Sequence, residues 1–162
     1  MTTTLDIVAK PGTPQLQMQR EFDATPELLF RAYTEPELLA QWLGPRRLEM
    51  IIDHFDARHG GTWRFIHKDA DGAEYGFHGV FHGTPTVEAG IVQTWEFEGA
   101  PGHVQLGTVT FERRGSKTVV HTNSVYQSVE ARDAEIASGM EGGMTEGHER
   151  LDELLARLVA AS

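Results

Sequence analysis

A chain of 162 residues, 40% hydrophobic and 23% charged, has the composition of one folded domain rather than that of a disordered segment. Its 24 acidic residues against 14 Lys and Arg give a formal charge of −10, which argues against nucleic acid or anionic lipid as a partner. The absence of cysteine excludes disulfides, thiolate nucleophiles and cysteine-based metal sites, and it fits a cytoplasmic location.

The start of the chain shows no targeting signal. Residues 1–10 lack a basic stretch followed by an apolar one, and every apolar run falls far short of the ~20 residues of a membrane-spanning helix. Pro11, Gly12 and Pro14 indicate a flexible arm over residues 1–15, in which residues 5–9 are a candidate for a short added strand. We therefore expect a single domain over residues 16–160 and no membrane insertion.

This domain begins with the pattern of a strand followed by two short helices. Apolar and polar residues alternate over 16–22. Thr25 and Pro26, followed by an acidic residue, form a typical helix start, and Thr34 to Glu37 repeat the same pattern. Both segments carry apolar residues on one face, so each helix must pack on another layer.

The middle of the chain has the pattern of strands joined by short turns. Asp71-Gly72 and Arg114-Gly115 are hairpin signals, and such short links favour antiparallel neighbours. The predicted strands cover residues 48–55, 62–67, 74–82, 91–97, 104–113 and 117–126. For the last of these, the alternation leaves open whether His121 and Asn123 or Val120 and Thr122 face inward.

From about residue 131 the apolar residues recur at helical spacing, which predicts one long C-terminal helix with Met140 and Met144 on its apolar stripe. Gly139, Gly142, Gly143 and Gly147 are unusual there. They indicate either close approach to a neighbour, space for a bound molecule, or a helix that starts only near Met144. The elements add up to an α+β fold, in which a curved antiparallel sheet of about seven strands faces this helix across a cavity.

These segments resemble the Aha-type family, which is related to the activator of heat-shock-protein ATPase and belongs to the START-like or SRPBCC superfamily of helix-grip folds. The motif PELLFRAYTEPELLAQWLGP at 26–45 resembles the family's helix pair, and DARHGGTWRF at 56–65 its D-x-R-x-G-G-x-W-x-F connection. QTWEF at 93–97, residues 108–112 and LDELL at 151–155 are similar to later signatures. The resemblance covers about residues 16–158. The chain departs from the family pattern at three places. Many members have Pro in place of His59 and an aromatic residue in place of Leu43, and many have Trp early in the last helix, where this chain has Met140 and Met144.

The resemblance implies a helix-grip fold and a range of roles, including lipid or polyketide binding, cyclisation, stress response and partnership with a chaperone. Proteins that stimulate the chaperone's ATPase carry a further N-terminal domain, whereas about 15 residues precede the first predicted domain strand here. We therefore expect the ATPase cofactor role least.

Aromatic and amphipathic residues on alternating strand positions are the candidate ligand-binding residues, because small-molecule sites are mainly apolar with a few polar groups. An ordinary core is the competing interpretation for each of them. The candidates are Trp63, Phe65, Tyr75, Phe77, Gln93, Trp95, Met140 and Met144.

Catalytic and metal chemistry receive little support. His67 is a weak candidate for an acid or base, followed by Glu96, which alternation places outward, and His121. His78 and His82 would lie ~13 Å apart along a strand, too far to share one zinc ion. We expect no metal and no cofactor.

The leading hypothesis is a protein that binds a small hydrophobic or amphipathic ligand between the sheet and the long helix, more probable as a binder than as an enzyme. A cyclase or hydrolase that uses the same cavity is the alternative. The sequence is also compatible with a homodimer formed through a sheet edge or the N-terminal arm.

Overall fold

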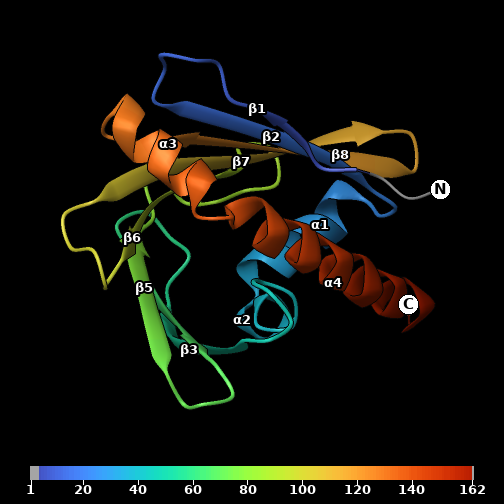
Figure 1. Cartoon of the computed structure of the whole chain (residues 1–162). Helices are drawn as coiled ribbons and strands as arrows, with labels where there is room; N and C mark the ends of the chain where they lie inside the picture. Colours follow the sequence, from blue (N-terminus) through green and yellow to red (C-terminus); the bar gives the residue numbers. More distant parts are fainter. Residues whose placement is uncertain (1–3, 162) are drawn as a thin grey trace.

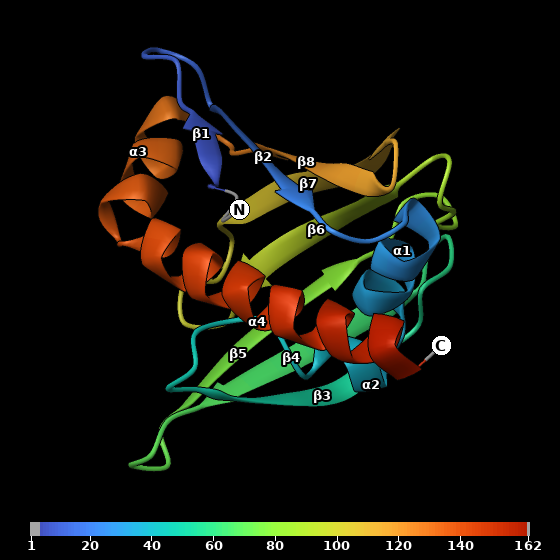
Figure 2. The same ribbon diagram turned by 90° about the vertical axis from the view of Figure 1, so that its right-hand side faces the viewer.

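Alternating apolar and polar residues build one antiparallel sheet that curls around a long helix (Figures 1 and 2). The structure, a computed structural model, describes residues 4–161. The predicted α+β helix-grip arrangement is confirmed, with eight strands where about seven were expected. The strands lie in the order β1-β2-β8-β7-β6-β5-β4-β3.

The strand boundaries follow the predicted ones closely. The strands are β1 (Asp6–Val8), β2 (Gln15–Phe22), β3 (Glu49–Phe55), β4 (Thr62–Lys68), β5 (Glu74–Val80), β6 (Ile91–Phe97), β7 (Val104–Arg114) and β8 (Lys117–Val125). The additional strand is β1, which lies within the segment predicted as an arm and pairs with β2, Ile7 opposite Met18. Residues 1–3 of that segment lie outside the described residues.

The helix pair after β2 forms where its capping residues predict it. α1 (Pro26–Thr34) begins with Thr25, whose hydroxyl accepts a hydrogen bond from the Leu28 N–H at 3.2 Å. α2 (Pro36–Leu39) begins at the proline of the predicted Thr34–Glu37 pattern; its N-cap is Glu35, without a side-chain bond, and the Thr34 hydroxyl donates to the Phe30 carbonyl. A threonine inside the last turn of α1 bonds back along its own helix, so it cannot cap the next one.

The predicted single C-terminal helix is two helices. α3 (Val129–Ala137) ends at Ser138, and Gly139, with φ +86°, turns the chain into α4 (Met140–Ala161). A left-handed residue interrupts a helix, and glycine adopts that conformation without steric cost. Within residues 4–161, no helix is long and apolar enough to cross a membrane.

The open question of the last strand is settled by its register. β8 pairs with β2 so that Thr122 lies opposite the buried Met18, and His121 lies opposite the exposed Gln19. Val120, at 2% exposure, joins the hydrophobic core. Val120 and Thr122 therefore face the helices, whereas His121 and Asn123 face the opposite side of the sheet.

The helix α4 is attached to the sheet through its C-terminal half. Leu151, Leu154 and Leu155 are at most 2% exposed and belong to the hydrophobic core. Asp152 binds the buried guanidinium of Arg20 from β2 through two hydrogen bonds of 2.9 and 2.6 Å. Bidentate geometry of this kind fixes both position and angle, so it sets how α4 crosses β2.

Gly147 allows close approach to a neighbouring segment, which is one of the explanations given above for the glycines of this helix. A Cβ atom at this position would lie 3.3 Å from the Trp42 carbonyl oxygen and 3.4 Å from the Gly44 nitrogen. The glycine thus lets α4 approach the backbone of the segment after α2. Gly142 is different, since a Cβ atom there would meet nothing within 4 Å.

These two glycines make a matched pair of stability tests. We expect Gly142→Ala to raise the free energy of unfolding by up to about 1 kcal/mol, because alanine favours the helix and finds free space. We expect Gly147→Leu to lower it by about 1–3 kcal/mol, because the side chain would collide with backbone that cannot rotate away. Urea unfolding followed by circular dichroism measures both, and equal effects of the two variants would contradict the packing described here.

Candidate functional site

The predicted ligand-binding residues of the strands share the concave face of the sheet, the face that α4 crosses. His67 lies opposite Tyr75, Phe65 opposite Phe77, and Trp63 opposite Gly79 between β4 and β5, so these alternate residues point to one side. Phe77 in turn lies opposite Phe97 of β6, whose Trp95 and Gln93 follow on the same side. The alternation predicted from the sequence is therefore realised.

The aromatic residues on this face differ sharply in exposure. Trp63 and Phe65 are 0% and 1% exposed, and the Trp63 ring lies 4.3 Å from that of Phe65 and 4.4 Å from that of Trp95. By contrast, Tyr75 and Phe97 are each 38% exposed. Trp63 and Phe65 consequently form the floor of the core, and the aromatic surface is most accessible to solvent at Tyr75 and Phe97.

Between these extremes lie Trp95, Phe77 and Gln93, all half-buried. The Phe77 and Phe97 rings are 5.1 Å apart, and the Trp95 ring covers Gly107 of β7, where a Cβ atom would lie 3.5 Å from its Cδ1. The Trp95 side chain therefore packs directly against the backbone of β7 at Gly107.

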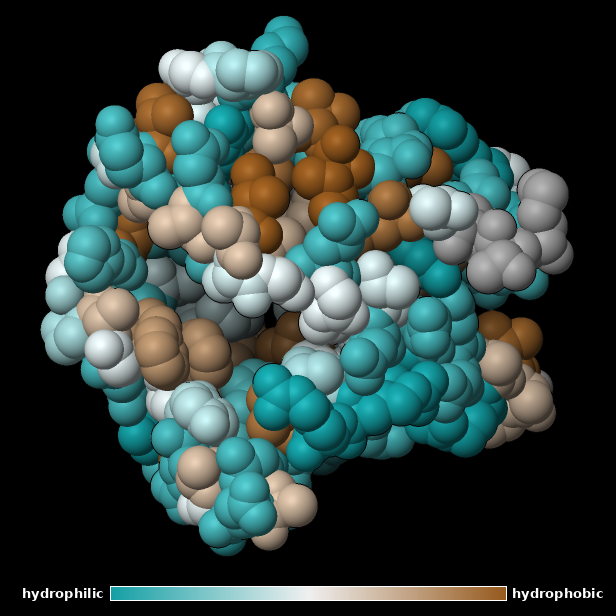
Figure 3. Space-filling model, in the orientation of Figure 1, coloured by the Kyte–Doolittle hydropathy of each residue, from teal (hydrophilic) through white to brown (hydrophobic). Residues whose placement is uncertain are grey.

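Met140 and Met144, the predicted residues of the helix, are also half-buried, in the first two turns of α4. They belong to the N-terminal half of the helix, away from the leucines that fill the core. Figure 3 shows this side of the molecule hollowed near its middle, between the positions that β6 and the start of α4 take in Figure 1.

The weak catalytic candidate His67 is buried at 8% exposure on the same face. Its ring meets the edge of Phe77 at 5.3 Å, and a Cβ atom on Gly44, which has φ +98°, would lie 2.6 Å from its Cε1. Burial and the positive charge of Arg150 lower the pKa of His67, so the ring is neutral at pH 7. Arg150 itself donates to the Gly44 carbonyl at 3.0 Å.

The two other acid–base candidates lie on the outer face. Glu96 accepts a hydrogen bond from the Gly102 N–H at 2.8 Å and lies 3.3 Å from His78, as the outward prediction required. His121 binds Glu112 at 2.7 Å. Neither residue can act together with His67 in one site on the concave face.

His148 is a buried histidine whose position the sequence did not reveal. It lies on α4 at 4% exposure, with its ring edge-on to Phe22 at 5.4 Å. Burial, aided by the nearby charge of Arg20, lowers its pKa to about 4, although Asp152 opposes this effect. Residue 148 lies three and seven residues before the apolar residues 151 and 155. This helical spacing was the available sequence signal that residue 148 faces inward.

Unpaired buried polar atoms accumulate on this concave side. Within residues 4–161, four buried side-chain polar atoms have no hydrogen-bond partner: Trp63 Nε1, His67 Nδ1, Gln105 Oε1 and His148 Nδ1. Gln105 lies opposite Trp95, so it shares the concave face. Native interiors leave few such atoms unpaired, so each of the four calls for a physical explanation.

Comparisons with known proteins agree with this architecture. Residues 23–156 match the family model described as Activator of Hsp90 ATPase homolog 1-like protein. A crystal structure from Rhodobacter sphaeroides has a TM-score of 0.87 at 29% identity, covering 95% of this chain and 99% of that one. No curated protein matches the chain.

Two further structures show the same fold at lower identity. A solution structure from Arthrobacter aurescens has a TM-score of 0.85 at 23% identity and covers 94% of this chain and 91% of that chain. The crystal structure of the AHSA1 protein from Silicibacter pomeroyi has a TM-score of 0.69 at 22% identity, with 91% and 99% covered.

The buried histidines make stability depend on pH. Below pH 6.5 the unfolded chain protonates His148, whereas the folded protein does not until about pH 4, so the free energy of unfolding falls across this interval. The expected loss from His148 is about 3 kcal/mol, and His67 acts in the same direction.

We expect His148→Leu to remove this share of the acid-induced loss, because leucine keeps the apolar packing and cannot bind a proton. The matched control is His103→Leu, at an exposed position. Urea unfolding at a series of pH values measures the slope. A His148→Leu variant that loses stability between pH 6.5 and 4 as steeply as the parent protein would refute the assignment.

Proposed function

The chain belongs to the Activator of Hsp90 ATPase homolog 1-like family, as its sequence motifs predicted, and we propose that it binds a small amphipathic molecule on the concave face of its sheet. The observation that carries this proposal is the aromatic surface that α4 does not cover. Tyr75 and Phe97 are 38% exposed on the side of the sheet that otherwise forms the core. Contiguous apolar surface that stays accessible next to a core is a common feature of ligand-binding grooves.

The apolar part of the ligand would lie against the half-buried rings. The rings of Phe77 and Phe97 lie 5.1 Å apart, and Trp95 lies on the same side of β6 two residues before Phe97. Met140 and Met144, half-buried at the start of α4, would supply the opposite wall and can change shape easily, since methionine is unbranched and polarisable. Such a wall suits a flexible or planar hydrophobic body.

The polar part of the ligand would use the unpaired atoms at the base of this surface. Trp63 Nε1 is a hydrogen-bond donor and Gln105 Oε1 an acceptor; both atoms are buried, and Trp63 is 0% exposed, so a ligand would reach them only after the side chains above them move. A ligand with both a carbonyl or hydroxyl oxygen and a donor would satisfy them, and each buried atom that gains a partner recovers part of its desolvation cost. This combination favours an amphipathic ligand over a pure hydrocarbon.

An enzymatic use of the same face, by a cyclase or hydrolase, rests on His67. Its Nδ1 is buried without a partner, and its lowered pKa keeps it neutral and able to accept a proton. If this second candidate holds, His67→Gln abolishes turnover of a bound polyketide or ester while ligand binding persists.

Binding is tested by titrating the protein with N-phenyl-1-naphthylamine, an uncharged hydrophobic probe whose fluorescence rises in an apolar site. We expect saturable binding that quenches tryptophan emission, because Trp95 lies in the proposed site. Phe97→Ser should weaken binding by about tenfold, since it removes a large apolar contact.

Leu106→Ser is the matched control. Leu106 is 42% exposed on the opposite face of the same sheet, so the substitution removes similar exposed apolar surface elsewhere. Binding that both variants weaken equally, or that neither variant changes, would place the probe outside the concave face and refute the proposal.

A further inference from the structure

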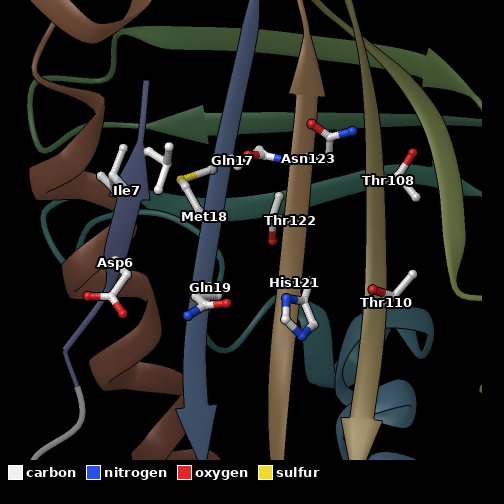
Figure 4. Close-up of a pocket in the computed structure, with 11 residues that line it drawn as sticks. Asp6, Ile7, Gln17, Met18, Gln19, Thr108, Thr110, His121, Thr122 and Asn123 are labelled. Carbon is white, nitrogen blue, oxygen red and sulfur yellow. The ribbon is translucent and has the colours of Figure 1, made fainter. Parts of the chain in front are cut away.

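A second hollow lies on the outer face of the sheet, the side opposite to α4. It is a groove of about 500 Å³ over β1, β2, β8 and β7 (Figure 4). Its volume falls within the range of ~300–1,000 Å³ that is usual for small-molecule sites.

The strand register arranges the side chains of this groove in two parallel rows. Each row takes one residue from each of the four strands: Asp6, Gln19, His121 and Thr110 form the first, and Val8, Gln17, Asn123 and Thr108 the second. Directly opposed residues on neighbouring strands lie ~4.5–5.5 Å apart, so each row is a ladder of closely spaced groups. The ladder consists almost entirely of amides, hydroxyls and an imidazole.

Most of these groups retain free hydrogen-bonding capacity. The side chains of Gln17, Gln19, Thr108 and Thr110 make no hydrogen bond to another described residue, although all four line the groove. Asn123 accepts a bond from Gln15 through its Oδ1 at 2.8 Å, which leaves its amide N–H groups available. The groove floor therefore offers both donors and acceptors.

The imidazole of His121 is held in a fixed orientation beside them. Its Nε2 lies 2.7 Å from Glu112, and the same carboxylate accepts hydrogen bonds of 3.1 and 3.3 Å from Arg114. The Glu112 carboxylate is therefore already bonded to His121 and Arg114, and the Nδ1 atom of His121 remains available to a ligand in the groove. Figure 4 shows the His121 ring beside Gln19 and Thr110.

The charge and polarity of the lining restrict the chemistry of a ligand. No Lys or Arg lines the groove, and Asp6 adds a negative charge to a protein that is acidic overall, so an anion is disfavoured. Val8, Ile7 and Met18 add apolar surface to the groove, but a purely hydrophobic ligand would leave the amides and hydroxyls of the two rows without partners, so it is disfavoured as well. We propose that this outer groove binds an uncharged, hydroxyl-rich small molecule of the carbohydrate class.

This site is tested on the whole protein by NMR, with D-glucose, cellobiose and myo-inositol as probes. The side-chain amide signals of Gln17, Gln19 and Asn123 report directly on the groove. We expect at least one probe to shift these signals saturably, with a Kd of the order of 1 mM or tighter, and the probe that binds defines the ring size and linkage preferred.

Two substitutions in the groove test whether the observed NMR shifts come from binding at this site. Thr110→Val and Gln19→Leu keep side-chain volume and strand compatibility while removing hydrogen-bonding groups, so each should weaken binding by about 3–10-fold. Gln93→Leu makes a similar change on the concave face and should leave sugar binding unchanged, whereas it should affect the hydrophobic probe. The two sites can thus fail independently.

Three results would overturn this inference. The first is that none of the three probes shifts the amide signals. The second is that the Thr110→Val and Gln19→Leu variants bind the probe as tightly as the parent protein does. The third is that the signals shift with protein concentration rather than with probe concentration. The last result would identify the groove as a contact between copies of this chain.

Discussion

The ion pair between Arg20 and Asp152 determines how the long helix lies across the sheet, and the remaining features of the concave face depend on it. A guanidinium at 5% exposure cannot remain unpaired without a large cost, so β2 and α4 must meet at this point. Arg20 also lies over the Phe22 ring, 4.6 Å from its centroid, which connects the charge pair to the hydrophobic core. With the helix fixed in its C-terminal half, its N-terminal half extends over the aromatic strands without sealing them.

This attachment divides the concave face into two parts. In the C-terminal half of α4, Leu151 and Leu154 are at most 2% exposed and belong to the same stabilising core as Trp63. Near its N-terminal half, Tyr75 and Phe97 remain accessible. A core that is closed at one end and open at the other can receive a ligand without unfolding, because the stabilising contacts are made elsewhere.

The two faces of the sheet carry different chemistry because strand residues alternate in direction. On the strands β4 to β6, the concave side collects aromatic rings, and on the strands β1, β2, β7 and β8, the outer side collects amides and hydroxyls. One sheet therefore offers an apolar surface and a polar groove that do not share a side chain.

Much of the fold could be predicted from the sequence, because its signals are local. Thr25 and Pro26 specify the start of α1, and the alternation in residues 62–67 specifies which side chains of β4 point inward. The candidate residues Trp63, Phe65, Phe77 and Trp95 were found in this way, but alternation gives direction only. It could not show that Trp63 and Phe65 are sealed whereas Tyr75 is accessible, because exposure depends on where the helix crosses.

Non-local pairing explains what the sequence could not reveal. The Arg20–Asp152 pair joins residues 132 positions apart, so no local pattern in the sequence could reveal it. Likewise, the outer groove exists only because the β1–β2–β8–β7 register aligns four polar residues in each row. The division of the C-terminal region into two helices depended on Gly139, whose left-handed backbone the composition of the segment allowed but did not require.

The central claim is that the start of α4 and the uncovered aromatic strands enclose a ligand. NMR of the protein labelled at its methionine methyl groups tests this directly, with N-phenyl-1-naphthylamine as the ligand. We predict that the methyl signals of Met140 and Met144 shift on binding and show cross-relaxation with the probe. The methyl signal of Met18, which lies in β2 between β1 and β8, should not change. Binding that leaves the Met140 and Met144 signals unchanged would contradict the account.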